Sequence, residues 1–92
     1  MSIVVRFHPT NMTAEQYDDV VLREGGTGKF PPEGRDYHIC FGTAGDLRVS
    51  EVWDSQEQLQ AYGEVLMPIL ANAGIQFSGE PEVFEVHNIV KR

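Results

Sequence analysis

The 92-residue chain lacks several features on which other classes of protein depend. Its single cysteine, Cys40, excludes an internal disulfide. Basic residues are few, 7 against 14 acidic ones, and the net charge of -7 repels phosphate backbones and anionic lipid. Apolar runs such as residues 3–5 are far too short to span a membrane, and the amino terminus has no secretory-signal pattern. We therefore expect a cytoplasmic protein that binds neither nucleic acid nor a membrane.

Residues 1–92 are expected to form one domain, because a chain of this length has no room for a second. A domain of this size buries only roughly 60–65% of the surface that its unfolded chain exposes. Its core is therefore marginal unless a metal or a partner subunit adds to it.

Four segments rich in β-branched and aromatic residues predict strands: 2–8, 37–43, 47–54 and 82–90. The turn Ala44-Gly45-Asp46 joins the middle two into a hairpin, because its glycine tolerates a positive φ. Residues 25–35 contain glycines and paired prolines that fit neither strand nor helix periodicity. This segment is predicted to be a loop that could close over a ligand.

Two segments with apolar residues three and four positions apart predict amphipathic helices: 14–25 and 55–73. Thr13 with Gln16, and Ser55 with Gln58, have the capping-box spacing of a helix start. Pro68 lies inside the second helix, where it removes a backbone donor. A kink, or a split into two shorter helices, is expected there.

The predicted order of strand, helix, strand, strand, helix, strand is typical of two split β-α-β units. It folds most simply as an α+β, ferredoxin-like domain: a four-stranded antiparallel sheet with both helices on one face. In the first strand, however, Ile3 and Val5 lie opposite Val4, and in the last Val83 lies opposite Phe84, so both faces are apolar. Exposing the second face would forfeit roughly 25 cal/mol per Å². We therefore expect the open face to pack against a copy of itself in a homodimer.

The element order, Glu-Val-Trp-Asp-Ser at 51–55 and Val-His-Asn-Ile-Val at 86–90 together resemble the dimeric α-β barrel superfamily over the whole chain. That superfamily includes antibiotic-biosynthesis-monooxygenase-like and heme-degrading proteins. The resemblance implies two sheets packed into a barrel, with Trp53 where members often place an aromatic beside a ligand cavity. Because this fold hosts oxygenases, decarboxylases and isomerases, the activity it implies is an analogy.

The heme-degrading members of the superfamily have a pattern of three residues: an Asn on the first strand, a Trp on the third strand and a His on the second helix. Here only Trp53 is present, since the first strand has Arg6 and His8 and residues 56–73 contain no histidine. The resemblance therefore implies no heme, and no cofactor is expected.

A two-residue turn at 44–45 would place His38 opposite Glu51, with Trp53 on the same face. The carboxylate would raise the proton affinity of the imidazole and orient one ring nitrogen, which makes His38 a candidate general base. The alternative is a polar pair at a barrel rim or a dimer interface, a structural role that perturbed pairs often have.

His87 and Glu85 share one face of the predicted last strand and form a second candidate pair. Here too the alternative is a histidine whose hydrogen bonds are satisfied at the subunit contact. No short spacing joins His8, His38 and His87, so no metal site is expected.

Four residues are candidate walls of a pocket for a small apolar or aromatic molecule: Trp53, Phe41, Tyr62 and Met67. They are equally typical of ordinary core. Two functions remain open. One is a cofactor-independent, monooxygenase-like enzyme with a His–Glu base, and the other is a ligand-binding or structural dimer without catalysis.

Overall fold

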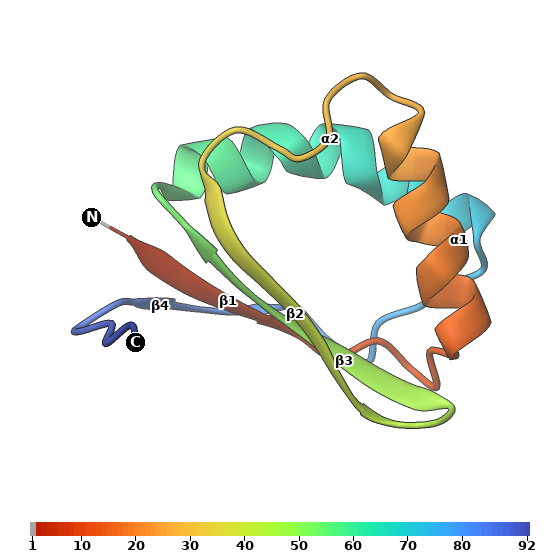
Figure 1. The fold of residues 1–92 in the computed structure, drawn as a ribbon. Helices are drawn as coiled ribbons and strands as arrows, with labels where there is room; N and C mark the ends of the chain where they lie inside the picture. The colour runs from red at the N-terminus through yellow and green to blue at the C-terminus, as the bar shows by residue number, and fades with distance from the viewer. Residues whose placement is uncertain (1) are drawn as a thin grey trace.

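The computed structural model describes residues 2–92 and has the predicted ferredoxin-like topology, which confirms the fold class (Figure 1). The elements are β1 (Ile3–Phe7), α1 (Ala14–Gly25), β2 (Arg35–Thr43), β3 (Asp46–Trp53), α2 (Gln56–Asn72) and β4 (Glu82–Glu85). The strands are antiparallel to their neighbours in the order β2-β3-β1-β4. Both helices lie over the same face of the sheet (Figure 1).

The helix starts follow the capping signals in the sequence. The Thr13 hydroxyl accepts from the Gln16 amide and the Gln16 side chain accepts from the Thr13 amide, a complete capping box. At α2 the Ser55 hydroxyl accepts from the Gln58 amide. A single helix runs through Pro68, so the alternative of two shorter helices is wrong. Within residues 2–92, no helix is both long and apolar enough to cross a membrane.

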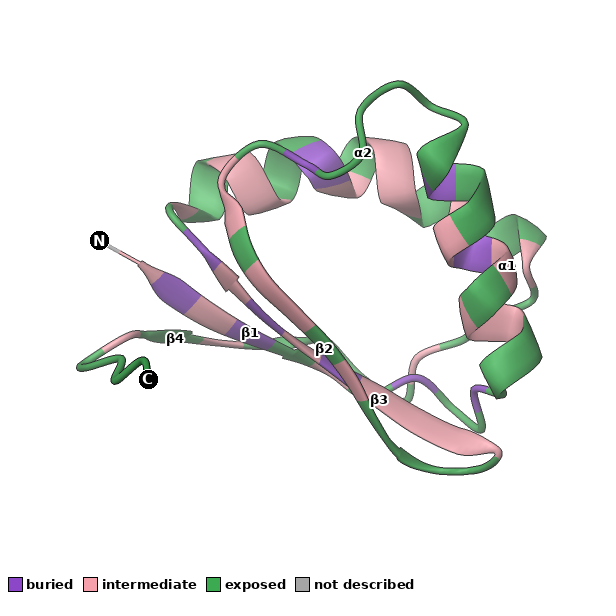
Figure 2. Ribbon diagram, viewed as in Figure 1, coloured by how far each residue is buried: buried purple, intermediate pink, exposed green. Residues whose placement is uncertain are grey.

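The core lies between the helices and the sheet and has two clusters. Ile3 and Val5 of β1 pack with Trp53 and Tyr62, and Trp53 and Val5 are fully buried. The second cluster contains five buried residues: Met12, Val20, Val49, Leu70 and Ile75. In Figure 2 the buried positions on the strands belong to β1 and β3, the central pair.

The face of the sheet opposite the helices exposes large apolar side chains. Phe84 of β4 is 52% exposed, Ile39 of β2 is 56% exposed and Phe41 is 40% exposed. Val4, which alternates with the buried Ile3 and Val5, lies on this open face as predicted.

The last strand is shorter than predicted, because β4 ends at Glu85 and residues 86–90 form no strand. Glu85 lies opposite Ile3, where β1 begins, and β4 pairs with no other strand. β1 has no residue before Ile3 with which β4 could pair further. The amide of Val86, the next residue after β4, donates a hydrogen bond to the Ser2 carbonyl. The β-branched composition of residues 86–90 is therefore not sufficient to form a strand there.

Candidate functional site

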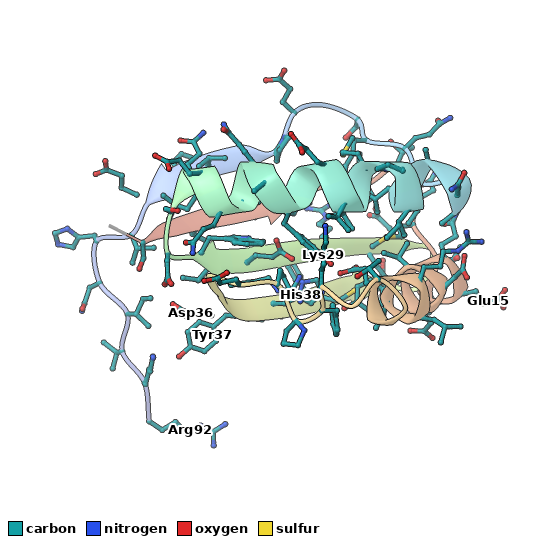
Figure 3. The ribbon with its side chains drawn as sticks, turned by 90° about the horizontal axis from the view of Figure 1, so that it is seen from above. Glu15, Lys29, Asp36, Tyr37, His38 and Arg92 are labelled. Atoms are coloured by element: carbon teal, nitrogen blue, oxygen red, sulfur yellow. The ribbon has the colours of Figure 1, made fainter. Side chains whose placement is uncertain are left out.

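The predicted register of the β2–β3 hairpin is confirmed, and it brings His38 and Glu51 together. The two residues are direct cross-strand partners, and His38 Nδ1 lies 2.5 Å from Glu51 Oε2. Both side chains face the helices. Figure 3 looks down through the helices onto the sheet and shows His38 on β2, a strand at the edge of the sheet, with Asp36 and Tyr37 nearer the start of that strand.

Glu51 is held as an anion by three donors. Besides His38, Arg35 Nη1 lies 3.1 Å from Oε2, and Trp53 Nε1 donates to Oε1 at 2.9 Å. Burial favours the neutral acid, but the hydrogen bonds from His38 and Trp53 and the charge of Arg35 outweigh it and lower the pKa of the Glu51 carboxyl. A carboxylate can only accept, so His38 Nδ1 carries the shared hydrogen.

Tyr17 of α1 extends this arrangement into a chain of three residues. Its hydroxyl lies 2.6 Å from His38 Nε2, and the two rings are stacked at 5.8 Å. Burial, together with nearby Cys40 and the carboxylates, raises the pKa of the Tyr17 phenol, so its hydroxyl keeps its hydrogen and can donate it to Nε2 when that nitrogen carries none. The Tyr17–His38–Glu51 chain therefore ends in a phenol oxygen with a free lone pair.

The chain forms part of the wall of a cavity between the sheet and the helices, which we call the inner cavity. Its polar lining consists of Tyr17, Glu24, Arg35, His38 and Glu51. Its apolar lining includes Phe7, Val49, Leu66, Leu70 and Phe77. The cavity measures about 50 Å³, room for a few water molecules, whereas a cavity that binds benzene measures about 150 Å³. An aromatic ligand would enter only with movement of the walls.

Glu24 is the second buried carboxyl group of the site and is 4% exposed. The Tyr62 hydroxyl of α2 donates to Glu24 Oε2. Burial and this hydrogen bond strongly raise the pKa of the Tyr62 phenol, so Tyr62 stays neutral at ordinary pH.

A larger and more open groove lies outside the inner cavity, between residues 28–33 and α2. We call it the outer groove; it measures about 430 Å³ and its lining includes Phe30, Gln58, Tyr62 and Val65. Two contacts join its wall to that of the inner cavity. One is the hydrogen bond from Tyr62 to Glu24, and the other places the Arg35 guanidinium 5.5 Å from the centre of the Phe30 ring.

The candidate wall residues do not gather around one pocket. Trp53 is buried in the core and reaches the site only through its bond to Glu51. Tyr62 lines the outer groove. Phe41 lies on the open face of the sheet and Met67 is 58% exposed on α2, and neither lines the inner cavity or the outer groove.

The second candidate pair is not assembled either. Both His87 and Glu85 are exposed, His87 lies beyond the end of β4, and neither lines the inner cavity or the outer groove. In residues 2–92 no group of three or more His, Cys, Asp or Glu side chains is placed to hold a metal ion.

Sequence reasoning missed three polar residues of the inner cavity. Tyr17 lies in the predicted helix 14–25 and Arg35 in the predicted loop 25–35, and neither side chain was given a role. Glu24 was not assigned a role, although its spacing from Tyr17 and Val20 places it on the buried side of α1. A charged residue on an otherwise apolar face of the predicted helix was the feature of the sequence that indicated a role for Glu24.

The structure defines an α+β, ferredoxin-like domain with a hydrogen-bonded Tyr–His–Glu chain at a cavity between sheet and helices. A scan of family models found no match to this chain, and a search of curated proteins found none. Solved structures do match it, and their fold is that of antibiotic-biosynthesis-monooxygenase-like proteins.

Three solved structures illustrate the likeness. One is a Deinococcus radiodurans protein provisionally assigned as an antibiotic biosynthesis monooxygenase, with 11% identity over 100% of this chain and 98% of its own, at a TM-score of 0.62. SnoaB, a cofactor-independent oxygenase from Streptomyces nogalater, has 16% identity to this chain. The match covers 99% of this chain and 96% of SnoaB, at a TM-score of 0.60. A protein of unknown function from Nitrosomonas europaea has 14% identity to this chain. The match covers 99% of this chain and 90% of that protein, at a TM-score of 0.54. At these identities the likeness establishes the shared fold.

Proposed function

We propose that this protein is a cofactor-independent oxygenase for a small phenol or enol bound in the inner cavity, with His38 as the general base. The observation that carries the proposal is the Tyr17–His38–Glu51 chain, in which Tyr17 Oη lies 2.6 Å from Nε2 and Nδ1 lies 2.5 Å from Glu51 Oε2. The His–Glu part of this chain has the geometry by which a carboxylate orients an imidazole for proton transfer.

The three residues have distinct roles in the proposed reaction. The substrate hydroxyl gives its proton to the Tyr17 oxygen while the Tyr17 proton passes to His38 Nε2. The products of this step are a substrate phenolate, a neutral Tyr17 and an imidazolium stabilised by Glu51. The phenolate then gives one electron to dioxygen, the oxidant in this class of reaction. The resulting phenoxyl radical and superoxide combine through a new carbon–oxygen bond, and the His38 imidazolium returns the proton to the peroxide oxygen to give a hydroperoxide.

Two further observations support the proposal. Apart from Glu24 and Arg35, the lining of the inner cavity outside the Tyr17–His38–Glu51 chain is apolar, which limits the access of water to the proton transfer. One structure with the same fold, SnoaB, is a cofactor-independent oxygenase. At 16% identity this supports the reaction class and does not identify a substrate.

Oxygen consumption with a panel of phenols, quinols and enols tests the proposal. Replacing His38 by Gln or Tyr17 by Phe should lower the rate about 100-fold or more, because each removes one step of the proton transfer. His8→Gln is the matched control, since His8 is exposed and its imidazole lies 3.5 Å from Asp46 of β3. Equal rates in wild type, His38→Gln and Tyr17→Phe would overturn the proposal.

The second candidate function is a ligand-binding or structural dimer without catalysis. The inner cavity favours it in one respect, because its volume of about 50 Å³ is below that needed for an aromatic ring. If it is correct, no substrate in the panel will raise oxygen consumption, while His38→Gln will still lower the free energy of unfolding by breaking the bond to Glu51.

We also propose that the protein is a homodimer joined through the open face of the sheet. Three large side chains on that face, Ile39, Phe41 and Phe84, are 40–56% exposed. An apolar sheet face of this kind is stable in water when a second apolar surface covers it, and a copy of the same face meets that need with two-fold symmetry.

A further inference from the structure

Glu24 lines the inner cavity and has one carboxylate oxygen without a hydrogen-bond donor among residues 2–92. Tyr62 donates to Oε2, while Oε1 has no hydrogen-bond partner among residues 2–92. Within that same range, every fully buried side-chain nitrogen or oxygen has a partner, so Oε1 is not sealed in the core. The residue is only 4% exposed and lines the inner cavity, so Oε1 is the acceptor atom of Glu24 that remains for a ligand there.

The charges around the inner cavity select the kind of group that can meet Oε1. Glu51 is paired with Arg35, which leaves Glu24 as the carboxyl group without a cationic partner among the cavity's lining residues. A carboxylate held out of water favours a hydrogen-bond donor, above all an ammonium group, and disfavours a second anion. A ligand with a carboxylate or phosphate at this position would be repelled.

Helix α1 fixes the spacing between the backbone positions of Glu24 and Tyr17. Tyr17, Val20 and Glu24 follow one face of α1, and Tyr17 and Glu24 are seven residues apart. Seven residues of α-helix span about 10.5 Å, close to two turns. A ligand that reaches both residues therefore needs polar groups at its two ends and an apolar body between them.

The outer groove provides the room that such a ligand lacks in the inner cavity. Tyr62 lines the outer groove, and its hydroxyl occupies the other oxygen of Glu24. Movement of Tyr62 away from Glu24 would join the inner cavity to a space of about 430 Å³. A ligand donor could then take over the hydrogen bond that Tyr62 gives up.

We infer that Glu24 is a second anchor of the site and binds an ammonium or other donor group at the far end of a phenolic substrate. The inference rests on the proposed function for the near end of the substrate, which meets Tyr17. It goes beyond that function because it makes Glu24 the residue that determines substrate preference. Phenols with a donor-bearing side chain are bound more tightly than plain alkylphenols.

Calorimetric binding of tyramine and 4-ethylphenol tests the inference, because the two compounds differ in the ammonium group alone. Wild type should bind tyramine about tenfold more tightly, the effect of one charge-assisted hydrogen bond. Glu24→Gln removes the negative charge and replaces one of the two carboxylate oxygens by an amide nitrogen, which is a donor. The preference should disappear while the affinity for 4-ethylphenol is unchanged.

Two control variants complete the experiment. Glu15→Gln removes the same charge from the exposed first turn of α1, where Glu15 points outward, away from His38, in Figure 3, and it should keep the preference. Tyr62→Phe frees the second oxygen of Glu24 and should strengthen tyramine binding, and it also tests the anchor if Glu24→Gln fails to fold. Equal binding of the two compounds by wild type, binding of neither, or an unchanged preference in Glu24→Gln would overturn the inference.

The anchor and the oxygenase proposal can fail separately. A tyramine preference that depends on Glu24, without oxygen consumption by wild type, would support the anchor and overturn the oxygenase. Oxygen consumption that depends on His38, with equal affinities for tyramine and 4-ethylphenol, would overturn the anchor and support the oxygenase.

Discussion

The indole Nε1 of Trp53 donates a hydrogen bond to Glu51 Oε1 at 2.9 Å, from the next inward-facing position of the same strand. Trp53 is fully buried in the core, so the carboxylate that orients His38 is held by a group packed on all sides. Core packing and the geometry of the candidate site are therefore coupled through this bond.

Replacing Trp53 tests that coupling. Trp53→Ala should lower the free energy of unfolding by roughly 3–5 kcal/mol because it leaves a large cavity. Trp53→Phe keeps most of the volume but removes the donor, and should cost about 2 kcal/mol. Met67→Ala, at an exposed position of α2, should change stability by less than about 0.5 kcal/mol. The measurement is denaturant unfolding followed by circular dichroism, since the single tryptophan is lost. Equal losses for Trp53→Phe and Met67→Ala would show that the bond contributes nothing.

The lowered pKa of Glu51 predicts a loss of stability in acid. Burial acts against the shift, but the bonds from His38 and Trp53 and the charge of Arg35 bring the pKa below the ordinary value of 4.5. As the pH falls, the unfolded chain takes up a proton at this position before the folded protein does, so the stabilisation present above about pH 4.5 is lost as pH falls toward the folded-state pKa.

Unfolding free energies measured between about pH 6 and pH 3 check this prediction. Glu51→Gln should give a flatter curve than wild type over that range, because it removes the titrating group. Glu64→Gln makes the same change in net charge on the exposed side of α2 and should keep the wild-type slope. Parallel curves for wild type and Glu51→Gln would contradict the assignment.

The His38–Glu51 pair was predictable because a short turn at residues 44–45 fixes the register of the whole hairpin. Arg35 was not. It is three residues from His38, and strict alternation would place the two side chains on opposite faces. An irregularity between Arg35 and Tyr37 returns Arg35 to the inner face, where it reaches Glu51. Such an irregularity depends on how the preceding loop packs, which strand periodicity does not encode.

The length of the last strand and the role of Glu24 were beyond prediction for a related reason. Residues 86–90 have strand composition, but strand formation needs a partner, and β1 begins opposite Glu85. The acceptor role of Glu24 depends on Tyr62, which lies 38 residues away in the sequence. In both cases the deciding contact is tertiary, while the periodicity that a sequence displays is local.

The apolar side chains on the open face of the sheet predict that the protein is a dimer. Wild type should elute with twice the 10.3 kDa mass of the chain, as measured by light scattering. Ile39→Asp should give a folded monomer, because Ile39 is 56% exposed in the single chain and a charge there would be buried unpaired in the dimer. Leu22→Asp, at a position on α1 that is 77% exposed, is the matched control and should leave the mass unchanged. A monomeric wild type, or a dimeric Ile39→Asp variant, would rule out this face as the interface.

The segment from 28 to 33 should respond to ligand binding, because its Phe30 ring packs against Arg35 of the inner cavity. Hydrogen exchange of the amides of Gly28, Lys29 and Phe30 should slow when tyramine binds, since a ligand that reaches the outer groove restricts the opening of this segment. The β2–β3 turn at residues 44–45 is exposed to partly exposed and lines neither space, so its exchange should stay constant. In Phe30→Ala the slowing should diminish, because the contact with Arg35 is gone. Equal changes at both segments would mean that ligand binding stabilises the protein as a whole, and no change at residues 28–30 would show that this segment does not close over the site.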